Sequence, residues 1–441
     1  MTRTKEDILK LIDDAGVRYI RLCFTDILGK IKGMSITRSE IEQVLEEGQG
    51  FDGSSVEGFA RIEESDLMAV PDPVTFRIIP WEIAGEKVAM MFCDITHPDG
   101  RPYEGDPRWI LRKNLKRLQD KGWTFYVGPE IEYFYFKNNH QTDTLDRDGY
   151  FDYGTVDIGT QLRKRSVIAL EEIGIAVECS HHEVAPSQHE IDLKYQEALV
   201  MADFAQVYRF IIKEVAMEHE HYATFMPKPI FGQNGSGMHC HMSIFDGDKN
   251  LFYDNKDTYH LSKMAQQFMA GVLNHVKEFT LVNNQWVNSY KRLVPGYEAP
   301  VYVGWGRRNR SSMVRVPGYR VGKEKATRIE LRSPDPAANP YLAFACMLSA
   351  GLEGIEKGYK LPEPIEENIF HISAEEKAKL KIDILPNSLE NAIREFENSE
   401  FVRKTLGDHV WEKLITNKKI EWDQYRMHVS QHEVDKYLSM L

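Results

Sequence analysis

The sequence predicts an α+β protein with a small N-terminal domain and a larger second domain. Its 441 residues exceed what one hydrophobic core usually covers. The segment 97–106 (HPDGRPYEGD) has the proline and glycine content of a linker. Short strands precede this segment, and strands that alternate with long helices follow it. We therefore expect an N-terminal domain of residues 1–103 and a C-terminal domain of residues 104–441.

In the first domain, apolar spacing predicts helices within residues 1–15 and near 38–47. Runs of β-branched and aromatic residues predict three strands, at 19–24, 31–36 and 87–95. The stretch 51–66 (FDGSSVEGFARIEESD) is too rich in glycine, serine and acidic residues for a core element. We interpret it as a loop, which is either plain solvated surface or functional.

The second domain begins with a helix from Asp106 and Pro107, an N-cap and first-turn pair, and this helix ends before Gly122. Apolar spacing predicts further helices, at 160–173, 199–219, 261–279, 340–357 and 432–441.

The stretch 123–136 (WTFYVGPEIEYFYF) reads as a strand with an unusual polar face. Alternation places Glu130 and Glu132 on one face, opposite Val127, Ile131 and Tyr133. Two ionised carboxylates roughly 7 Å apart repel each other, and burying them unpaired costs several kcal/mol. The sequence therefore predicts positive charge between them.

Three later stretches repeat this division into an apolar face and an ionic face. Their ionic residues are Glu190 and Asp192 in 182–194, His239, His241 and Ser243 in 238–245, and Arg328, Glu330 and Arg332 in 326–332. Any one of these strands fits an ordinary salt-bridged surface, but four in one chain favour a shared cavity. Carboxylates with an occasional imidazole suit Mg²⁺ or Mn²⁺, and the chain has neither the H-E-x-x-H motif nor the paired cysteines of a zinc site.

A basic segment lies within this acidic protein. Residues 307–332 hold seven Arg and two Lys against two Glu, whereas the whole chain has a formal net charge of -12. The segment fits a solvated face or an RNA contact, but the acidic remainder favours small anions such as phosphate or carboxylate, and it argues against nucleic acid as a partner. The chain contains no P-loop, no G-x-G-x-x-G and no G-x-S-x-G motif.

Two glycine-containing turns add candidate binding residues. The NGSG turn at 234–237 either offers backbone N–H groups to a small carboxylate or is a plain turn. The segment 291–300 (KRLVPGYEAP) places Glu298 between two prolines with Gly296 as a pivot, which is typical of a lid that presents one carboxylate.

Composition also indicates the compartment. Five scattered cysteines without C-x-x-C spacing fit free thiols in a reducing cytoplasm. The N-terminus does not read as a signal peptide, and no run approaches the ~18 apolar residues that span a bilayer. We expect a cytoplasmic protein that does not bind membranes.

Seven motifs together resemble type I glutamine synthetase of bacteria and archaea over essentially the whole chain. They are FDGSS, VGPEIEYF, HHEVAPSQHEID, NGSGMHCHMS, KRLVPGYEAP, RNRSSMVRVP and RIELRSPDPAANPY. The resemblance implies an N-terminal β-grasp domain and a catalytic domain with a curved antiparallel sheet flanked by helices. It further implies a homododecamer of two stacked hexamers, with each active site between neighbouring subunits.

The resemblance also implies roles for individual residues. One metal would be held by Glu132, Glu183 and Glu190, and the other by Glu130, His239 and Glu330. ATP would be bound with help from His241, Ser243 and Lys325, and glutamate by Asn234, Gly235, Arg292 and Arg332. Arg310 and Arg315 would contact the phosphates, and Arg310 and Glu298 would also touch the substrate. The implied cofactors are two or more Mg²⁺ or Mn²⁺ ions per site, with ATP as co-substrate.

The implied reaction is ATP-dependent ligation of ammonia to glutamate through γ-glutamyl phosphate. Asp52 from the neighbouring subunit would bind ammonium, and Glu298 would accept its proton and close the lid. The adenylylated branch of the family carries a tyrosine where this chain has Phe370, so control by adenylylation is not expected. Arg61 matches the arginine that is tied to glutamine feedback in the other branch.

Two alternatives remain. A γ-glutamyl ligase acting on an organic amine would keep both metal sets but usually alters the surroundings of Asp52, and FDGSS is intact here. A nitrogen-status sensor without turnover predicts a broken metal or lid residue, and none of the residues assigned above is missing. Contact with a regulatory protein is compatible with catalysis.

Overall fold

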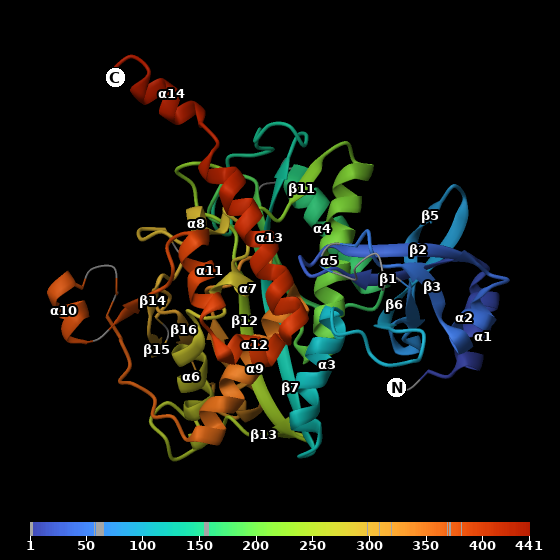
Figure 1. The fold of residues 1–441 in the computed structure, drawn as a ribbon, viewed down its shortest axis with the longest axis horizontal. Coiled ribbons are helices and arrows are strands. Elements are labelled where there is room, and N and C mark those ends of the chain that lie inside the picture. Colours follow the sequence, from blue (N-terminus) through green and yellow to red (C-terminus); the bar gives the residue numbers. More distant parts are fainter. Residues whose placement is uncertain are drawn as a thin grey trace.

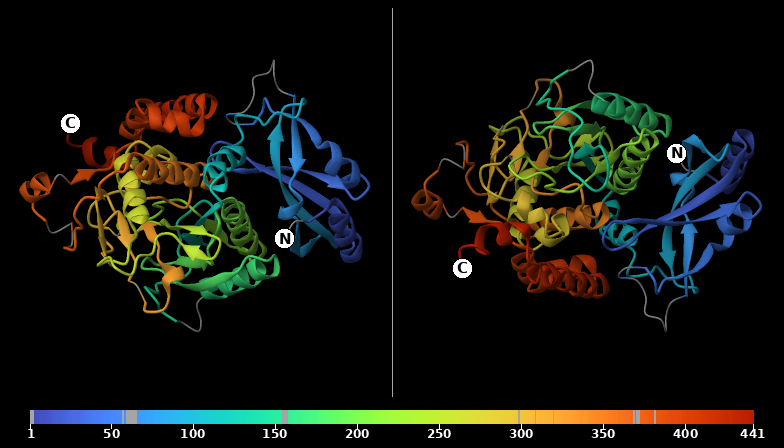
Figure 2. Two further views of the ribbon diagram at one scale, coloured as in Figure 1. Left: turned by 90° about the horizontal axis from the view of Figure 1, so that it is seen from below. Right: turned by 90° about the horizontal axis from the view of Figure 1, so that it is seen from above.

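The computed structural model has two domains that lie side by side (Figures 1 and 2). It describes residues 3–56, 58, 66–153, 158–297, 299–307, 309–318, 320–367, 369, 372–380 and 382–441. Each domain has its own cluster of buried apolar side chains. No helix in these described ranges combines the length and the apolar character needed to cross a bilayer.

The N-terminal domain is a six-stranded sheet flanked by two helices. Its strands follow the order β2-β1-β6-β4-β3, and β5 pairs with β6. The elements are α1 (Lys5–Ala15), β1 (Val17–Thr25), β2 (Ile31–Thr37), α2 (Ile41–Glu47), β3 (Gln49–Asp52), β4 (Asp66–Pro71), η2 (Pro73–Thr75), β5 (Arg77–Ile83) and β6 (Glu86–Thr96). Strands β1 and β6 are parallel and the other pairs are antiparallel, so this is the mixed sheet expected of a β-grasp unit.

Both ends of the expected loop at 51–66 belong to the sheet. Phe51 and Asp52 lie on β3, and Asp66 begins β4, so the loop prediction is wrong at both ends. Phe51 is half-buried with its ring centroid 5.0 Å from that of Phe24, and this packing gives β3 the apolar contact that its composition hides. Residues 57 and 59–65 lie outside the described part of the chain.

The C-terminal domain is built on a ten-stranded sheet in the order β15-β16-β17-β12-β7-β9-β8, with β10 and β11 paired to β7 and β13 to β12. Neighbours are antiparallel except β15 and β16. The strands are β7 (Trp123–Phe136), β8 (Val177–His182), β9 (Gln188–Leu193), β10 (Gln196–Glu197), β11 (Tyr222–Thr224), β12 (Met238–Asp246), β13 (Lys249–Asn250), β15 (Trp305–Arg307), β16 (Val314–Val316) and β17 (Ile329–Leu331). A small pair, β14 (Tyr302–Val303) with β18 (Asp383–Ile384), and the one-turn η3 (Glu324–Ala326) complete this set.

Helices pack on the apolar side of this sheet (Figure 1). They are α3 (Pro107–Gln119), α4 (Ile158–Glu172), α5 (Ala198–Glu218), α6 (Lys263–His275), α7 (Thr280–Asn283), α8 (Ser289–Arg292), α9 (Pro340–Lys357), α11 (Leu389–Glu397), α12 (Glu400–Leu406) and α13 (Asp408–Arg426). Two further helices lie at the periphery of the domain: α10 (Ala374–Lys379) and α14 (Gln431–Tyr437), which projects away from it (Figure 1). The expected helix at 261–279 is shorter, because α6 ends at His275 and α7 begins a new turn. Helices α6 and α9 cross so closely that a Cβ on Gly271 would lie 2.0 Å from the Ala350 carbonyl oxygen.

A buried arginine joins the two domains. Arg108 on α3 is 2% exposed and donates to Asp203 on α5 at 3.0 Å. It also reaches Asp72 and Asp94 of the N-terminal domain, at 2.8 and 2.5 Å. Because a buried charge is stable only when paired, this cluster links the two domains at α3.

Candidate active site

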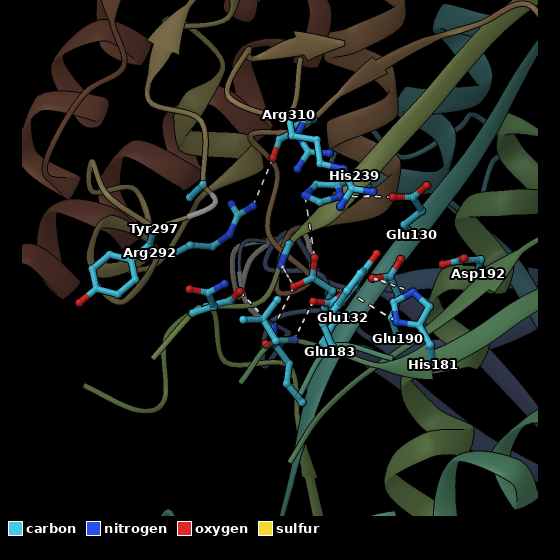
Figure 3. Close-up of a pocket in the computed structure, with 18 of the residues that line it drawn as sticks. Glu130, Glu132, His181, Glu183, Glu190, Asp192, His239, Arg292, Tyr297 and Arg310 are labelled. Carbon is cyan, nitrogen blue, oxygen red and sulfur yellow. Dashed lines mark hydrogen bonds and ion pairs between the residues drawn. The ribbon is translucent and has the colours of Figure 1, made fainter. Parts of the chain in front are cut away.

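Strand register brings the four ionic faces together. On neighbouring strands, Glu130 lies opposite both His239 and Asp192, and Glu132 lies opposite Glu190. Further along the sheet, His241 and Arg315 flank Glu330. The side chains of the central strands meet in one cavity of about 320 Å³ (Figure 3).

Glu130, His239 and Glu330 form one group that could hold a cation, since one ligand atom from each lies within 4.8 Å of the others. His239 Nδ1 is 3.3 Å from Glu130 Oε2 and 3.8 Å from Glu330 Oε1. Burial lowers the pKa of His239 to about 4, helped by the Arg332 charge. The imidazole is therefore neutral near pH 7, as a metal ligand must be.

The carboxylates of this first group are held ionised. Burial by itself would raise the pKa of Glu330, but the neighbouring His241 ring and the Arg332 guanidinium lower it to about 2. Burial likewise opposes ionisation of Glu130, yet hydrogen bonds from His239 and His241 keep its pKa well below the ordinary value. His241 accepts from Arg328 Nε through Nδ1 at 3.0 Å, so its Nε2–H is free to donate to Glu130 at 2.6 Å.

A second group consists of His181, Glu183 and Glu190, again within 4.8 Å of one another. His181 lies 3.7 Å from Glu183 and 3.9 Å from Glu190. Glu132 borders this group, and its Oε2 accepts from Gln188 Nε2 at 2.9 Å and from Gly237 N at 3.0 Å. The strand β8 therefore adds an imidazole to the three carboxylates singled out in the sequence.

The second group carries excess negative charge. Burial and the charge of Glu183 raise the pKa of Glu132 well above its ordinary value. Burial and the neighbouring Asp192 do the same for Glu190. Oxygen donors that repel each other this strongly fit a divalent hard cation, which would relieve the repulsion.

Arginines close the other side of the cavity. Arg332 Nη1 donates to Glu330 Oε1 at 2.5 Å, and Arg315 donates to the other oxygen of the same carboxylate. Arg292 is buried and its guanidinium donates to the carbonyls of Ser333 and Arg332, at 2.8 and 3.2 Å. These backbone contacts fix the guanidinium where it lines the cavity beside Asn234, Gly235 and Arg310.

The residues to which the resemblance assigns ATP binding line an adjoining cavity of about 200 Å³. His241, Ser243 and Lys325 line it. Glu130 and Asp192 line both cavities, so the two spaces meet at the carboxylates. Lys325 is exposed and its ammonium lies 2.8 Å from Asp248.

One described sequence candidate, Asp52, is not brought to the cavity in this chain. Asp52 is exposed on β3 and accepts from Ser54 N at 2.8 Å, whereas no described residue before Glu130 lines the cavity. Glu298 and Arg61 lie outside the described residues.

The structure adds residues that sequence reasoning missed. His181 lies on β8 two residues before Glu183, in a strand without the strong apolar alternation that would have pointed to it. Tyr150 and Phe151 line the cavity from a loop without periodicity, and the Phe151 ring packs edge-on to His181 at 4.7 Å. Asp146 accepts from Ser187 N at 2.6 Å and contacts His182 at 3.1 Å, which ties this loop to the strand pair that carries Glu190.

Two candidate cation sites beside fixed guanidiniums are typical of enzymes that transfer phosphoryl groups. Comparison with known proteins gives the family. The family model described as "Glutamine synthetase, catalytic domain" matches residues 104–437, and "Glutamine synthetase, beta-Grasp domain" matches residues 16–98. The chain therefore belongs to the glutamine synthetase family.

Individual relatives agree. Glutamine synthetase of Mycolicibacterium smegmatis is 48% identical over 100% of both chains, and that of Methanosarcina mazei is 48% identical over 99% of this chain and 98% of its own. The cryo-EM structure of Plasmodium falciparum glutamine synthetase superposes with a TM-score of 0.89 at 27% identity over 99% of both chains. A structure of GmaS in complex with ADP gives 0.87 at 30% identity over 100% of both.

These findings confirm the expected family, the β-grasp and catalytic fold, and the activity: the protein is a glutamate–ammonia ligase. Members of the family generally use ATP and divalent metal ions.

Metal binding should release protons. A cation that binds at Glu132 and Glu190 must displace the protons that their raised pKa values retain, so affinity for Mn²⁺ should rise as the pH is raised. Calorimetric titration in buffers of different ionisation enthalpy measures this release. Glu132→Gln should release fewer protons than the wild type. Affinity independent of pH would contradict the assignment.

Proposed function

We propose that the cavity activates the γ-carboxylate of glutamate as γ-glutamyl phosphate and then admits ammonia to the acyl carbon. The observation that carries this assignment is the meeting of carboxylates from β7 and β9, the His239 imidazole from β12 and several guanidiniums in one cavity. A carboxylate oxygen is a poor leaving group, and transfer of the ATP γ-phosphate turns it into a good one. Preorganised charge and positioning supply most of the rate in such a reaction.

For the metals, we propose two Mg²⁺ or Mn²⁺ ions per site. The first would be held by Glu130, His239 and Glu330, and the second by Glu132, Glu183 and Glu190, with His181 in reach. When bound, the cations neutralise charge on the ATP phosphates. The ionised state of Glu330 and the neutral state of His239 support the first set.

The remaining polar residues would bind the two substrates at opposite ends. Arg292 and Arg332 would pair with glutamate carboxylates, and Asn234 and Gly235 would contact the same substrate beside them. His241, Ser243 and Lys325 would contact the nucleotide, since all three line the adjoining cavity. Arg310 and Arg315 would lie against the phosphates and stabilise the charge that develops during transfer.

Ammonium becomes a nucleophile only after it loses a proton. We assign cation binding to Asp52 of a neighbouring subunit and proton acceptance to Glu298. The position of Asp52 outside the cavity of its own chain supports a site that is shared between subunits. The proposed assembly is a dodecamer of two stacked hexamers.

Regulation and location complete the proposal. Glutamine feedback would act through Arg61, and Phe370 leaves no hydroxyl for adenylylation. A regulatory protein is a further candidate partner.

We also propose a cytoplasmic location, which the five free cysteines support. The boundary between the two domains is placed between residues 103 and 104.

Ammonium should be required for turnover. Phosphate release from ATP and glutamate with Mg²⁺ should depend on ammonium and yield glutamine, and Glu298→Ala should lower this rate by about 10²–10⁴-fold because the general base is lost. Glu172→Ala, on the exposed end of α4, is the control and should match the wild type. Release that responds only to an organic amine would make the protein an amine ligase. Absence of turnover with ATP bound would favour a sensor.

Shared active sites should permit complementation. Asp52→Ala and Glu130→Ala should each be inactive alone, but subunits mixed during assembly should regain about one quarter of wild-type activity, because one in four sites receives two intact halves. Mixing Glu130→Ala with Glu132→Ala should restore nothing, since both changes affect the same half. Equal results from the two mixtures would contradict a shared site.

A further inference from the structure

Lys228 is a buried lysine without a carboxylate partner among the described residues. It is 9% exposed and follows β11 in the segment that leads to the NGSG turn. Burial and the nearby Arg292 charge lower the pKa of its ammonium. A lysine in this position loses hydration without gaining an ion pair among the described residues, so other contacts must offset the cost of burying its charge.

Both ends of Lys228 are fixed by neighbouring segments. Its backbone N–H donates to Asn288 Oδ1 at 2.7 Å, and Asn288 Nδ2 donates back to its carbonyl at 3.0 Å. At the other end, the ammonium donates to the Gln233 carbonyl and lies 3.8 Å from the centre of the Tyr297 ring. At this distance a buried ammonium is attracted by the electron-rich ring face.

The three segments that Lys228 joins all lead into the cavity. Gln233 directly precedes Asn234 and Gly235 in the chain, and both of these line the cavity. Asn288 is the N-cap residue of α8, whose last residue is Arg292. Tyr297 itself lines the cavity and is half-buried.

Tyr297 has few other restraints in the described structure. The preceding Gly296 has φ of 96°, and a Cβ there would meet nothing within 4 Å, so the turn is not held by packing around this glycine. The ammonium contact is therefore a specific attachment of Tyr297 to the body of the domain.

We propose that Lys228 is a positioning residue that holds Tyr297 against the NGSG turn and thereby keeps water from the reacting acyl group. The inference rests on the proposed function, in which γ-glutamyl phosphate forms in this cavity. Two fates then compete. Ammonia attacks the γ-carbonyl carbon, the bond from that carbon to the phosphate oxygen breaks, and glutamine and phosphate leave. Water attacking the same carbon breaks the same bond and regenerates glutamate, so that phosphate is released and ATP is consumed without glutamine being formed.

Coupling is the readout, because a purely structural role would lower activity without changing the products. Wild-type enzyme should release one phosphate per glutamine formed. Lys228→Met keeps the length of the chain but removes the charge, and it should raise phosphate released per glutamine by about twofold or more. Lys228→Arg, which retains a cation for the ring, should restore coupling.

Lys418→Met is the matched control. Lys418 is also buried, and its ammonium lies 3.9 Å from the Trp286 ring, but it also lies 2.9 Å from Glu421 Oε2, belongs to α13 and does not line the cavity. Because this ion pair is lost as well, Lys418→Met should lose at least as much stability as Lys228→Met while still forming one glutamine per phosphate. If Lys228→Met fails to fold, Tyr297→Leu removes the same contact from the other side and should uncouple in the same way.

The outcomes separate this inference from the proposed function. Phosphate release by the wild type without glutamine would overturn the proposed function itself. A coupled wild type together with coupled Lys228→Met and Tyr297→Leu variants would overturn the positioning role alone. Uncoupling in Lys418→Met to the same extent would also overturn it, because general destabilisation would then explain the effect.

Discussion

Electrostatic repulsion between buried carboxylates is the constraint on which the rest of the structure depends. Glu132, Glu190 and Glu330 are each less than 9% exposed. At positions this buried, an unpaired negative charge destabilises the folded state by several kcal/mol per group. The protein balances this charge with imidazoles and guanidiniums on adjacent strands, and the proposed cations would balance the remainder. Under the proposed function, a site with this excess negative charge would bind divalent cations, and the cations would in turn hold the phosphates of ATP.

The same strands resist this repulsion through their opposite faces. Val127, Ile131 and Tyr133 on β7 are at most 1% exposed and pack in the main hydrophobic core. Burial of each such side chain contributes roughly 1.5–3 kcal/mol. Function and stability are therefore assigned to the two faces of one strand, and period-two alternation keeps them apart. Lys228 extends this pattern, since it positions cavity residues from a site where a charge is otherwise unfavourable.

Alternation in the sequence predicts which residues share a face, but not which residues face each other across strands. The span of β7, the helix α9 and the four ionic faces follow from local patterns. The pairing of Glu130 with Asp192 depends on register, which non-local packing decides. His181 was missed because β8 lacks a strong apolar pattern, and Arg108 was missed because its partners come from both domains. The edge strands β3 and β5 were hidden by glycine and proline.

Transfer of oxygen isotope from substrate to phosphate tests the central claim most directly. If the cavity activates glutamate as an acyl phosphate, glutamate labelled with ¹⁸O in its γ-carboxylate should pass one labelled oxygen to the released phosphate for each glutamine formed, because the former carboxylate oxygen leaves with phosphorus. Mass spectrometry of the phosphate measures this transfer. Unlabelled phosphate accompanying glutamine would show that ATP is cleaved without phosphorylating glutamate, and it would contradict the account.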